Sequence, residues 1–361
     1  MAFIPGLELS RHFFHECVEP RLARLIPDLV YGAALIGDGS EVLGHDTAVS
    51  TDHDWGPKVQ IFLRPQDFAD TASTVIPALD QLLPGEFMGW PVCFVDRRRP
   101  SGIDRGVYAA GSPAHGVEMH TIASWTERRL GVCVRASRDL TPCDWLSIPE
   151  PILLSATRGE VFRDDVGELA SMRSQLAWFP RDVWLYKLAS QWARVSEEVA
   201  FVGRTGDVGD DLGSRVIAAR LVHETMRVAF LMERRYAPYA KWIGREFNQL
   251  YCAGALGPEL AATLNAPDWR SREAALGRAL MVVAGLHRQM AVAPTVAAYF
   301  TRPYHAINAV EIAQSIFEAI NDPAISALPR LGAIDQLVDN TAVLTSAGRT
   351  RAIAAALHGE T

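Results

Sequence analysis

The chain has 361 residues, 49% of them hydrophobic and 21% charged, with a formal net charge of -7. This length favours two domains, and the negative charge offers no basic field to nucleic acid. No apolar run reaches the roughly 18 residues of a membrane span, so we expect no membrane partner. The 5 cysteines lack a C-x-x-C motif, which argues against a zinc site or a disulfide framework. The N-terminus has no signal-peptide pattern, so we expect a cytoplasmic protein.

The first part of the chain, residues 1–150, has the pattern of a mixed α/β domain. Amphipathic helical periodicity alternates there with short apolar or alternating runs that are typical of strands. The expected elements are a helix over 7–27, strands over 29–37 and 59–63, a helix over 66–83, and strands over 91–96 and 117–122.

The second part, residues 151–361, has helical periodicity with little sign of strand. Gly and Pro mark several junctions between its segments. The fold class is therefore predicted as α+β, with a mixed-sheet domain followed by an all-helical domain. The expected helices cover 165–178, 181–202, 212–235, 239–251, 256–265 and 270–292.

The segment 37–63 carries the residues that point to chemistry. It opens with a tight turn containing Gly39 and Ser40, directly after an apolar run. Glycine lets the backbone approach a phosphate, and the serine hydroxyl can donate a hydrogen bond to it. Asp52 and Asp54 follow, and in an extended segment their carboxylates would lie on one side. One or two carboxylates together with phosphate oxygens suit Mg²⁺, whereas the alternative is a solvated acidic turn.

A third carboxylate, Glu118, lies inside the strand expected over 117–122. A bare charge in a strand is costly unless it is paired or metal-bound. Alternation puts Glu118 and His120 on the same face. Three carboxylates are enough for a site of one or two metal ions, with Asp52 and Asp54 as the other ligands. The alternative is an edge strand whose polar face meets water.

The Gly-Ser turn, the Asp-x-Asp pair and a later acid in Val117-Glu118-Met119 resemble the nucleotidyltransferase fold of the polymerase-beta type. The order of an α/β domain and a helical bundle is similar to that of the kanamycin-type nucleotidyltransferases. Most of the chain also resembles domain of unknown function 4037, through DHDWGPKVQIF, VWLYKLASQW, GDDLGS and MERRYAPYAKW. One departure is the stretch 55–58, which separates Asp54 from the next strand, whereas the superfamily's second acid leads straight into it.

The resemblance implies further roles in the helical part. A Lys near the triphosphate and a carboxylate that serves as base on the acceptor are expected there. Lys187, Gln191 and Arg194 lie at i, i+4 and i+7 and share a helix face, which Glu198 extends; the alternative is a solvated face. Lys241 is flanked by aromatic residues and could instead lie over apolar surface. The predicted nucleotide contacts are thus Lys187, Arg194 and Lys241, and the acceptor-side candidates are Gln191 and Glu198.

The predicted function is Mg²⁺-dependent transfer of a nucleoside monophosphate, AMP from ATP, to a small-molecule acceptor with release of pyrophosphate. Two alternatives stay open. The acceptor could be a protein, or the chain could be a catalytically inactive nucleotide-binding or interaction protein. The sequence does not identify the acceptor, the base of the nucleotide, the general base or the oligomeric state.

Overall fold

The computed structural model describes residues 3–52, 55–98, 104–108, 114–135, 139–287 and 292–359. The chain forms two compact units, which are described one at a time. The first consists of Met1–Leu140 and Ile152–Ala177, and the second of Thr141–Pro151 and Trp178–Thr361. Where the sequence predicts one boundary after residue 150, the chain therefore passes between the units at residues 140, 151 and 177.

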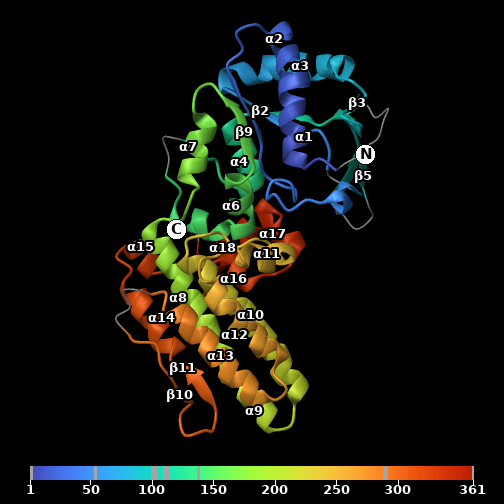
Figure 1. Ribbon diagram of the computed structural model, residues 1–361. Helices are drawn as coiled ribbons and strands as arrows, with labels where there is room; N and C mark the ends of the chain where they lie inside the picture. The colour runs from blue at the N-terminus through green and yellow to red at the C-terminus, as the bar shows by residue number, and fades with distance from the viewer. Residues whose placement is uncertain are drawn as a thin grey trace. The chain divides into compact units, whose positions relative to one another are not determined.

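The first unit is built on a four-stranded mixed sheet of order β8-β2-β1-β9 (Figure 1). Strand β2 pairs antiparallel with β1 and parallel with β8. The expected helix over 7–27 is present with a π-helical turn in its middle. The elements are α1 (Gly6–Phe13), a π-helical segment (Phe14–Val18), α2 (Glu19–Leu25), β1 (Tyr31–Leu35), a 3₁₀ helix (Ala48–Asp52), β2 (Val59–Leu63), α3 (Pro65–Leu82), β3 (Glu86–Phe87), β4 (Trp90–Pro91), β5 (Cys93–Arg98), β6 (Asp104–Tyr108), β7 (Ala114–His115), β8 (Val117–His120), α4 (Ile122–Leu130), β9 (Glu160–Asp164) and α7 (Glu168–Gln175).

The two faces of this sheet differ because side chains alternate along a strand. One face carries apolar residues such as Ala33, Ile61 and Met119, which pack against α1, α2 and α3 in a single buried core. The opposite face carries Phe62, whose ring meets Trp125 of α4 edge-on. Gln60, Glu118 and His120 belong to this second face by the same alternation. The polar candidates and α4 therefore share one side of the sheet.

Strand β9 was not predicted, and it shows that the chain after residue 150 is not all helix. It pairs with β1 and completes the sheet. The turn before it depends on Gly159, which has φ +75°. A Cβ at this position would lie 2.0 Å from the carbonyl oxygen of Leu35.

We expect Gly159→Ala to lower the free energy of unfolding of the first unit by about 1–3 kcal/mol, the usual cost of a strained backbone position. Urea titration measures this change. Gly167→Ala is the matched control, because Gly167 also has a positive φ of +73° but a Cβ there meets nothing within 4 Å. Equal losses in both variants would contradict the proposed clash with Leu35.

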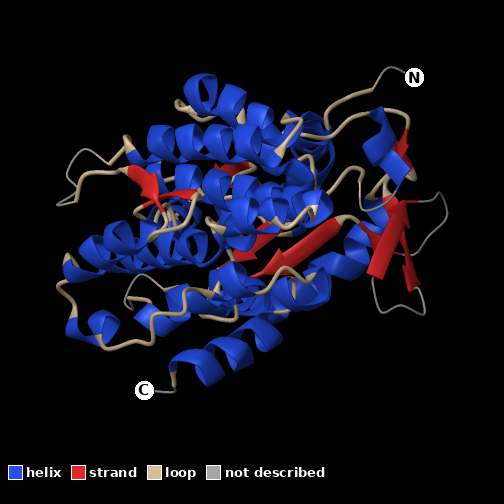
Figure 2. Ribbon diagram, turned by 90° about the horizontal axis from the view of Figure 1, so that it is seen from below, coloured by secondary structure: helices blue, strands red, loops and turns tan. Residues whose placement is uncertain are grey.

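The second unit consists mainly of helices, as the sequence predicts, with one short hairpin of β10 (Val296–Ala298) and β11 (His305–Ile307). Figure 2 shows helices making up most of the drawn chain and strands the smaller part. Over the described chain no helix has the length and apolar character needed to span a membrane. Helix α6 (Glu150–Thr157) begins in this unit and continues into the first. The other helices are α5 (Pro142–Ser147), α8 (Arg181–Glu198), α9 (Phe201–Asp207), α10 (Asp211–Met232), a 3₁₀ turn (Ala240–Trp242), α11 (Ile243–Phe247), α12 (Ala253–Asn265), α13 (Trp269–Ala284), α14 (Ala309–Glu318), α15 (Pro323–Ser326), α16 (Ile334–Leu337), α17 (Thr341–Leu344) and α18 (Ala347–His358).

Candidate functional site

The Gly-Ser turn leaves the end of β1 on the polar side of the sheet. The Gln60 side chain holds the backbone of Ile36, accepting from its N–H at 3.0 Å and donating to its carbonyl at 2.9 Å. Gly39 has φ +127°, and a Cβ there would lie 2.3 Å from a carboxylate oxygen of Glu41. The positive φ favours glycine at this position. Ser40 follows at a half-buried position.

Two acidic side chains, Glu41 and Asp46, anchor the segment that follows the turn. The carboxylate of Glu41, which is 2% exposed, forms an ion pair with Lys58. One oxygen of Asp46 accepts hydrogen bonds from the N–H of Gly6 at 2.7 Å and from the indole of Trp55 at 2.9 Å. Gly6 is the first residue of α1, so the acidic side chain also lies at the positive end of that helix. These contacts fix the loop between β1 and β2 to the body of the unit.

Glu118 lies on β8, an edge strand, in register with Gln60 of β2. Its carboxylate is 2.9 Å from Nε2 of His120 and accepts a hydrogen bond of 3.1 Å from Arg128. His120 does share its face, as alternation predicts. Hydrogen bonding to His120, aided by the charge of Arg128, outweighs partial burial and lowers the pKa of Glu118 to about 2. The side chain is 53% exposed, so a stable carboxylate faces solvent here.

Helix α4 links Glu118 to the Gly-Ser turn. Arg128 and Arg129 are consecutive residues of this helix. Arg128 pairs with Glu118, and Arg129 pairs with Asp38 of the turn. The sequence brings this about with a Thr121 capping box, which starts α4 directly after β8. The turn and the third acid, far apart in sequence, are thus each paired with one of two consecutive arginines of α4.

The structure describes only part of the Asp-x-Asp pair. Asp52 is the last residue of the 3₁₀ helix Ala48–Asp52, so the extended backbone assumed for the pair does not hold on its N-terminal side. The helix forms locally: the N–H of Thr47 donates to the Ser50 hydroxyl at 3.0 Å, and the N–H of Ser50 donates back to the Thr47 carbonyl at 2.8 Å. The Asp52 side chain and the whole of Asp54 lie outside the described residues. Their roles remain predictions.

The stretch 55–58 fits ahead of β2 without breaking the sheet. Pro57, which cannot donate a hydrogen bond, comes before the strand, whose first residue, Val59, donates from its N–H to the carbonyl of Gly116 at 2.8 Å. Trp55 is buried, at 3% exposure. The stretch 55–58, in which this chain departs from the superfamily pattern, therefore changes the segment before β2 and leaves the pairing of β2 intact.

Several residues of this face were not identified from the sequence. They are Asp38, Glu41, Lys58, Arg128 and Arg129, which pair with Glu118 or with one another, and Gln60, which holds the backbone of Ile36. The rarity of lysine in the chain was a signal for Lys58, since only three occur. Among the side chains that the structure describes, which exclude Asp52 and Asp54, no group of three or more His, Cys, Asp or Glu is arranged to hold a metal ion.

Lys187 occupies a closed charge cluster in the second unit. Its ammonium is 3.1 Å from Glu150 and 2.9 Å from Asp335, and its side chain is 0% exposed. Arg227 completes the cluster, 2.9 Å from Asp335 and 3.5 Å from Glu150. We name these four residues the buried charge cluster. An ammonium enclosed in this way has its charge satisfied inside the unit, and we do not include it among the proposed nucleotide contacts.

Gln191 and Arg194 share a face of α8, as their spacing predicts, and both reach Glu224 of α10. The side-chain oxygen of Gln191 also accepts a 3.0 Å hydrogen bond from the side-chain amide of Gln336. Burial would raise the pKa of Glu224, but a hydrogen bond from His223 and the charges of Arg194 and Arg227 outweigh it and lower the pKa to about 2. This face thus joins α8 to α10 and is not a row of solvated side chains.

Two other predicted residues belong to the second unit, the half-buried Glu198 and the exposed Lys241. Glu198 forms a 2.8 Å ion pair with Arg220. The exposed Lys241 places its ammonium 4.8 Å from the centre of the Trp242 ring, a cation–π contact. As contacts of an acceptor and a nucleotide, respectively, they stay predictions.

The comparisons with known proteins agree with part of the sequence interpretation. The family model "Domain of unknown function (DUF4037)" matches residues 145–243, which include three of the four quoted motifs and exclude DHDWGPKVQIF. The resemblance to this family is therefore confirmed over that segment. Among solved structures, a nucleotidyltransferase-like protein from Exiguobacterium sibiricum is similar at 10% identity and a TM-score of 0.31, over 78% of this chain and 73% of that one. A TM-score this low does not show that the two proteins share a fold. No curated protein matches the sequence.

Proposed function

We propose that the first unit carries a nucleotidyltransferase active site, which moves AMP from ATP to a small-molecule acceptor and releases pyrophosphate. The observation that carries the proposal is that two consecutive residues of α4 pair with the two candidate parts, Arg128 with Glu118 and Arg129 with Asp38 of the Gly-Ser turn. Phosphoryl-type transfer uses a turn whose backbone can approach a phosphate closely, a carboxylate that faces solvent, and adjacent guanidinium groups. Residues of the second unit are not needed for this part of the proposal.

The residues present are suited to Mg²⁺ in their chemistry. Glu118 offers an ionised oxygen ligand, and magnesium prefers carboxylate oxygens together with substrate phosphates. Asp52 and Asp54 would hold the ion together with Glu118. When bound, the ion would neutralise charge on the phosphates. The guanidinium groups of Arg128 and Arg129 add positive charge on the same side.

In the proposed reaction an acceptor hydroxyl attacks the α-phosphorus of ATP. A new P–O bond forms, the bond to the β-phosphate breaks, and pyrophosphate leaves with its electron pair while the acceptor proton passes to a base. The backbone at Gly39 and the hydroxyl of Ser40 hold the β- and γ-phosphates, and Glu118 either completes the metal site or polarises the acceptor. Positioning and charge neutralisation supply most of the rate enhancement.

Calorimetric titration of the full chain with ATP, GTP, CTP and UTP, with and without Mg²⁺, tests the proposal. We expect Mg²⁺-dependent binding of ATP. Changing residues that only orient metal ligands costs about 10- to 100-fold in affinity, so Asp52→Asn/Asp54→Asn should cost at least about 100-fold. Asp67→Asn is the matched control, because Asp67 pairs with Arg64 at 2.6 Å on α3 of the same unit.

Failure of the wild-type chain to bind any of the four nucleotides would overturn the proposal. Binding that survives in the double mutant would place the nucleotide elsewhere in the chain. Tight Mg²⁺-dependent binding with no pyrophosphate release, across hydroxyl and amine acceptors and protein lysates, would favour a nucleotide-binding protein without catalysis. Transfer of labelled AMP to a protein in the lysate would identify a protein acceptor.

A further inference from the structure

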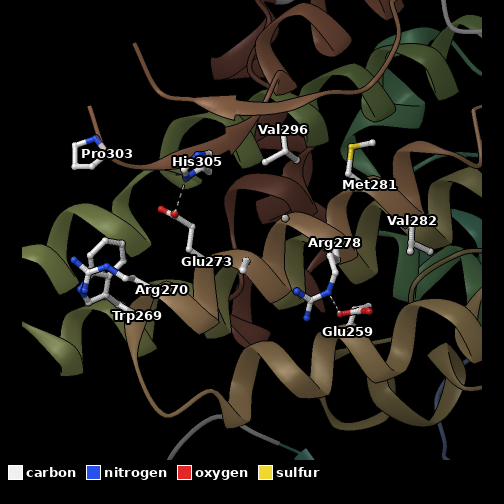
Figure 3. Close-up of a pocket in the computed structure, with 12 residues that line it drawn as sticks. Glu259, Trp269, Arg270, Glu273, Arg278, Met281, Val282, Val296, Pro303 and His305 are labelled. Carbon is white, nitrogen blue, oxygen red and sulfur yellow. Dashed lines mark hydrogen bonds and ion pairs between the residues drawn. The ribbon is translucent and has the colours of Figure 1, made fainter. Parts of the chain in front are cut away.

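The second unit contains a groove of about 820 Å³ along α13, beside the β10–β11 hairpin (Figure 3). Its carboxylates are already engaged within the unit, Glu273 with His305 and Glu259 with Arg278, as the dashed lines in Figure 3 mark. We therefore assign this groove no ligand. In the first unit, by contrast, an imidazole with no role in the proposed reaction contacts a candidate metal ligand.

This imidazole belongs to His120, one of two donors that hold the carboxylate of Glu118. The Oε2 atom of Glu118 lies 2.9 Å from Nε2 of His120 and 3.1 Å from a guanidinium nitrogen of Arg128. The imidazole and guanidinium nitrogens are 3.2 Å apart. Three polar atoms therefore form a compact triangle at one oxygen of the candidate ligand.

The partners of the imidazole decide which of its nitrogens carries a proton. A guanidinium group can only donate hydrogen bonds, and an ionised carboxylate can only accept them. An Nε2 atom without a proton would face Oε2 of Glu118 as a second acceptor at 2.9 Å, with no hydrogen between the two. His120 therefore carries a proton on Nε2 and donates it to Glu118.

The ring of His120 is fixed by its surroundings. It lies in register with Phe62 of the neighbouring strand β2, and the centres of the two rings are 6.1 Å apart. The His120 side chain is 11% exposed. Strand β8 places it two residues after Glu118, on the same face of the sheet. The imidazole therefore has little freedom to turn away from the carboxylate.

Arg128 is held less firmly than His120. Its side chain is 55% exposed, and the long stem of an arginine has many rotamers. Glu118 is 53% exposed, and an ion pair between exposed side chains is worth only about 0–1 kcal/mol. A cation that binds the carboxylate can therefore displace the guanidinium at small cost, while the packed imidazole stays in place.

We propose that His120 is a positioning residue for the metal site, and that its Nε2–H keeps the Glu118 carboxylate in one orientation when an ion replaces Arg128. The imidazole acts through Glu118 and does not bind the ion through Nε2, since that atom carries the proton. Hydrogen bonds that orient a metal ligand in this way contribute about 10- to 100-fold to metal affinity. The proposal rests on the proposed function, which requires the metal ion.

Calorimetric titration of the full chain with Mn²⁺ alone and with Mn²⁺ and ATP measures this contribution without turnover. His120→Leu should weaken Mn²⁺ binding by about 10- to 100-fold. His120→Gln should restore the affinity to within about threefold of the wild type, because its side-chain amide can donate from a position close to that of Nε2. His12→Leu is the matched control and should change nothing, since His12 pairs with Glu16 at 2.9 Å on the exposed side of α1.

A second comparison shows whether His120 acts only through Glu118. The double variant Glu118→Ala/His120→Leu should bind Mn²⁺ no more weakly than Glu118→Ala. Circular dichroism checks that each variant is folded. Unchanged Mn²⁺ affinity in His120→Leu, a loss that folded His120→Gln does not restore, or weaker binding in the double variant would overturn the role of His120 and leave the proposed function standing. A wild-type chain that binds neither Mn²⁺ nor ATP would instead overturn the proposed function, and the role of His120 with it.

Discussion

Asp335→Asn is expected to lower the free energy of unfolding by about 3–5 kcal/mol, the usual cost of removing one partner from a buried ion pair. The buried charge cluster is balanced, with Lys187 and Arg227 facing Glu150 and Asp335. The variant leaves one positive charge in excess at a site that is 0% exposed at the lysine. Urea titration of the full chain measures the loss.

The matched control for this variant is an ion pair in the same unit whose arginine is exposed. Arg220 and Glu198 are 2.8 Å apart, with Arg220 57% exposed, so Arg220→Gln should cost less than about 1 kcal/mol. Lys187→Met/Asp335→Asn removes one charge of each sign and should cost less than the sum of its single changes. A loss in Asp335→Asn no larger than that of Arg220→Gln would show that the cluster contributes little to stability.

The same cluster gives the stability a definite pH dependence. Burial alone would raise the pKa of Asp335, but the charges of Lys187 and Arg227 outweigh it and hold the pKa well below its ordinary value. A pKa lower in the folded than in the unfolded chain means that the stabilisation is full above about pH 4 and is lost as the pH falls below it. Asp335→Asn should therefore show a weaker loss of stability in acid than the wild type.

The strands that the sequence predicts best are those with local patterns. The run at β1 is buried on both faces, and β2 carries apolar residues at both ends, so each is visible in a short window. Strand β9 is different: its residues, EVFRD, are all half-buried, and it is held by pairing with β1, more than a hundred residues earlier. Such a strand is fixed by tertiary contact, and no local pattern marks it.

The residues of the candidate site also divide into those that a local pattern predicts and those that only tertiary contacts place. Glu118 and His120 were placed on one face because two-residue alternation is local. The burial of Lys187 could not be read from its helix, since Asp335, its partner at 2.9 Å, is 148 residues away in sequence. The contact of Arg129 with Asp38 likewise depends on how α4 packs on the sheet. Spacing therefore suggests candidate residues, and only the fold shows which charges are already paired.

Glu118→Gln is expected to lower the rate of the proposed nucleotidyl transfer by about 100- to 1,000-fold, as does the loss of one preorganised electrostatic contact in other enzymes. The variant keeps the shape of the side chain and removes the charge. Because Glu118 is 53% exposed, its pair with Arg128 adds little to folding, and the unfolding transition should move by less than about 1 kcal/mol. Pyrophosphate release under saturating nucleotide measures the rate. An unchanged rate would exclude Glu118 from the chemistry.

Arg128→Ala separates the role of the carboxylate from that of its partner. Arg128 donates to Glu118 at 3.1 Å and so competes with a metal ion for the same oxygen. Without the guanidinium, Mn²⁺ alone should bind more tightly, while the nucleotide complex should weaken because a positive charge beside the phosphates is gone. The pKa of Glu118, about 2 in the wild type, should rise, since the charge of Arg128 helps to lower it. Calorimetry with Mn²⁺ and with Mg²⁺ and ATP distinguishes these effects. Opposite changes in the two affinities are expected only if Arg128 and the metal share Glu118, whereas a purely structural arginine would move both the same way or neither.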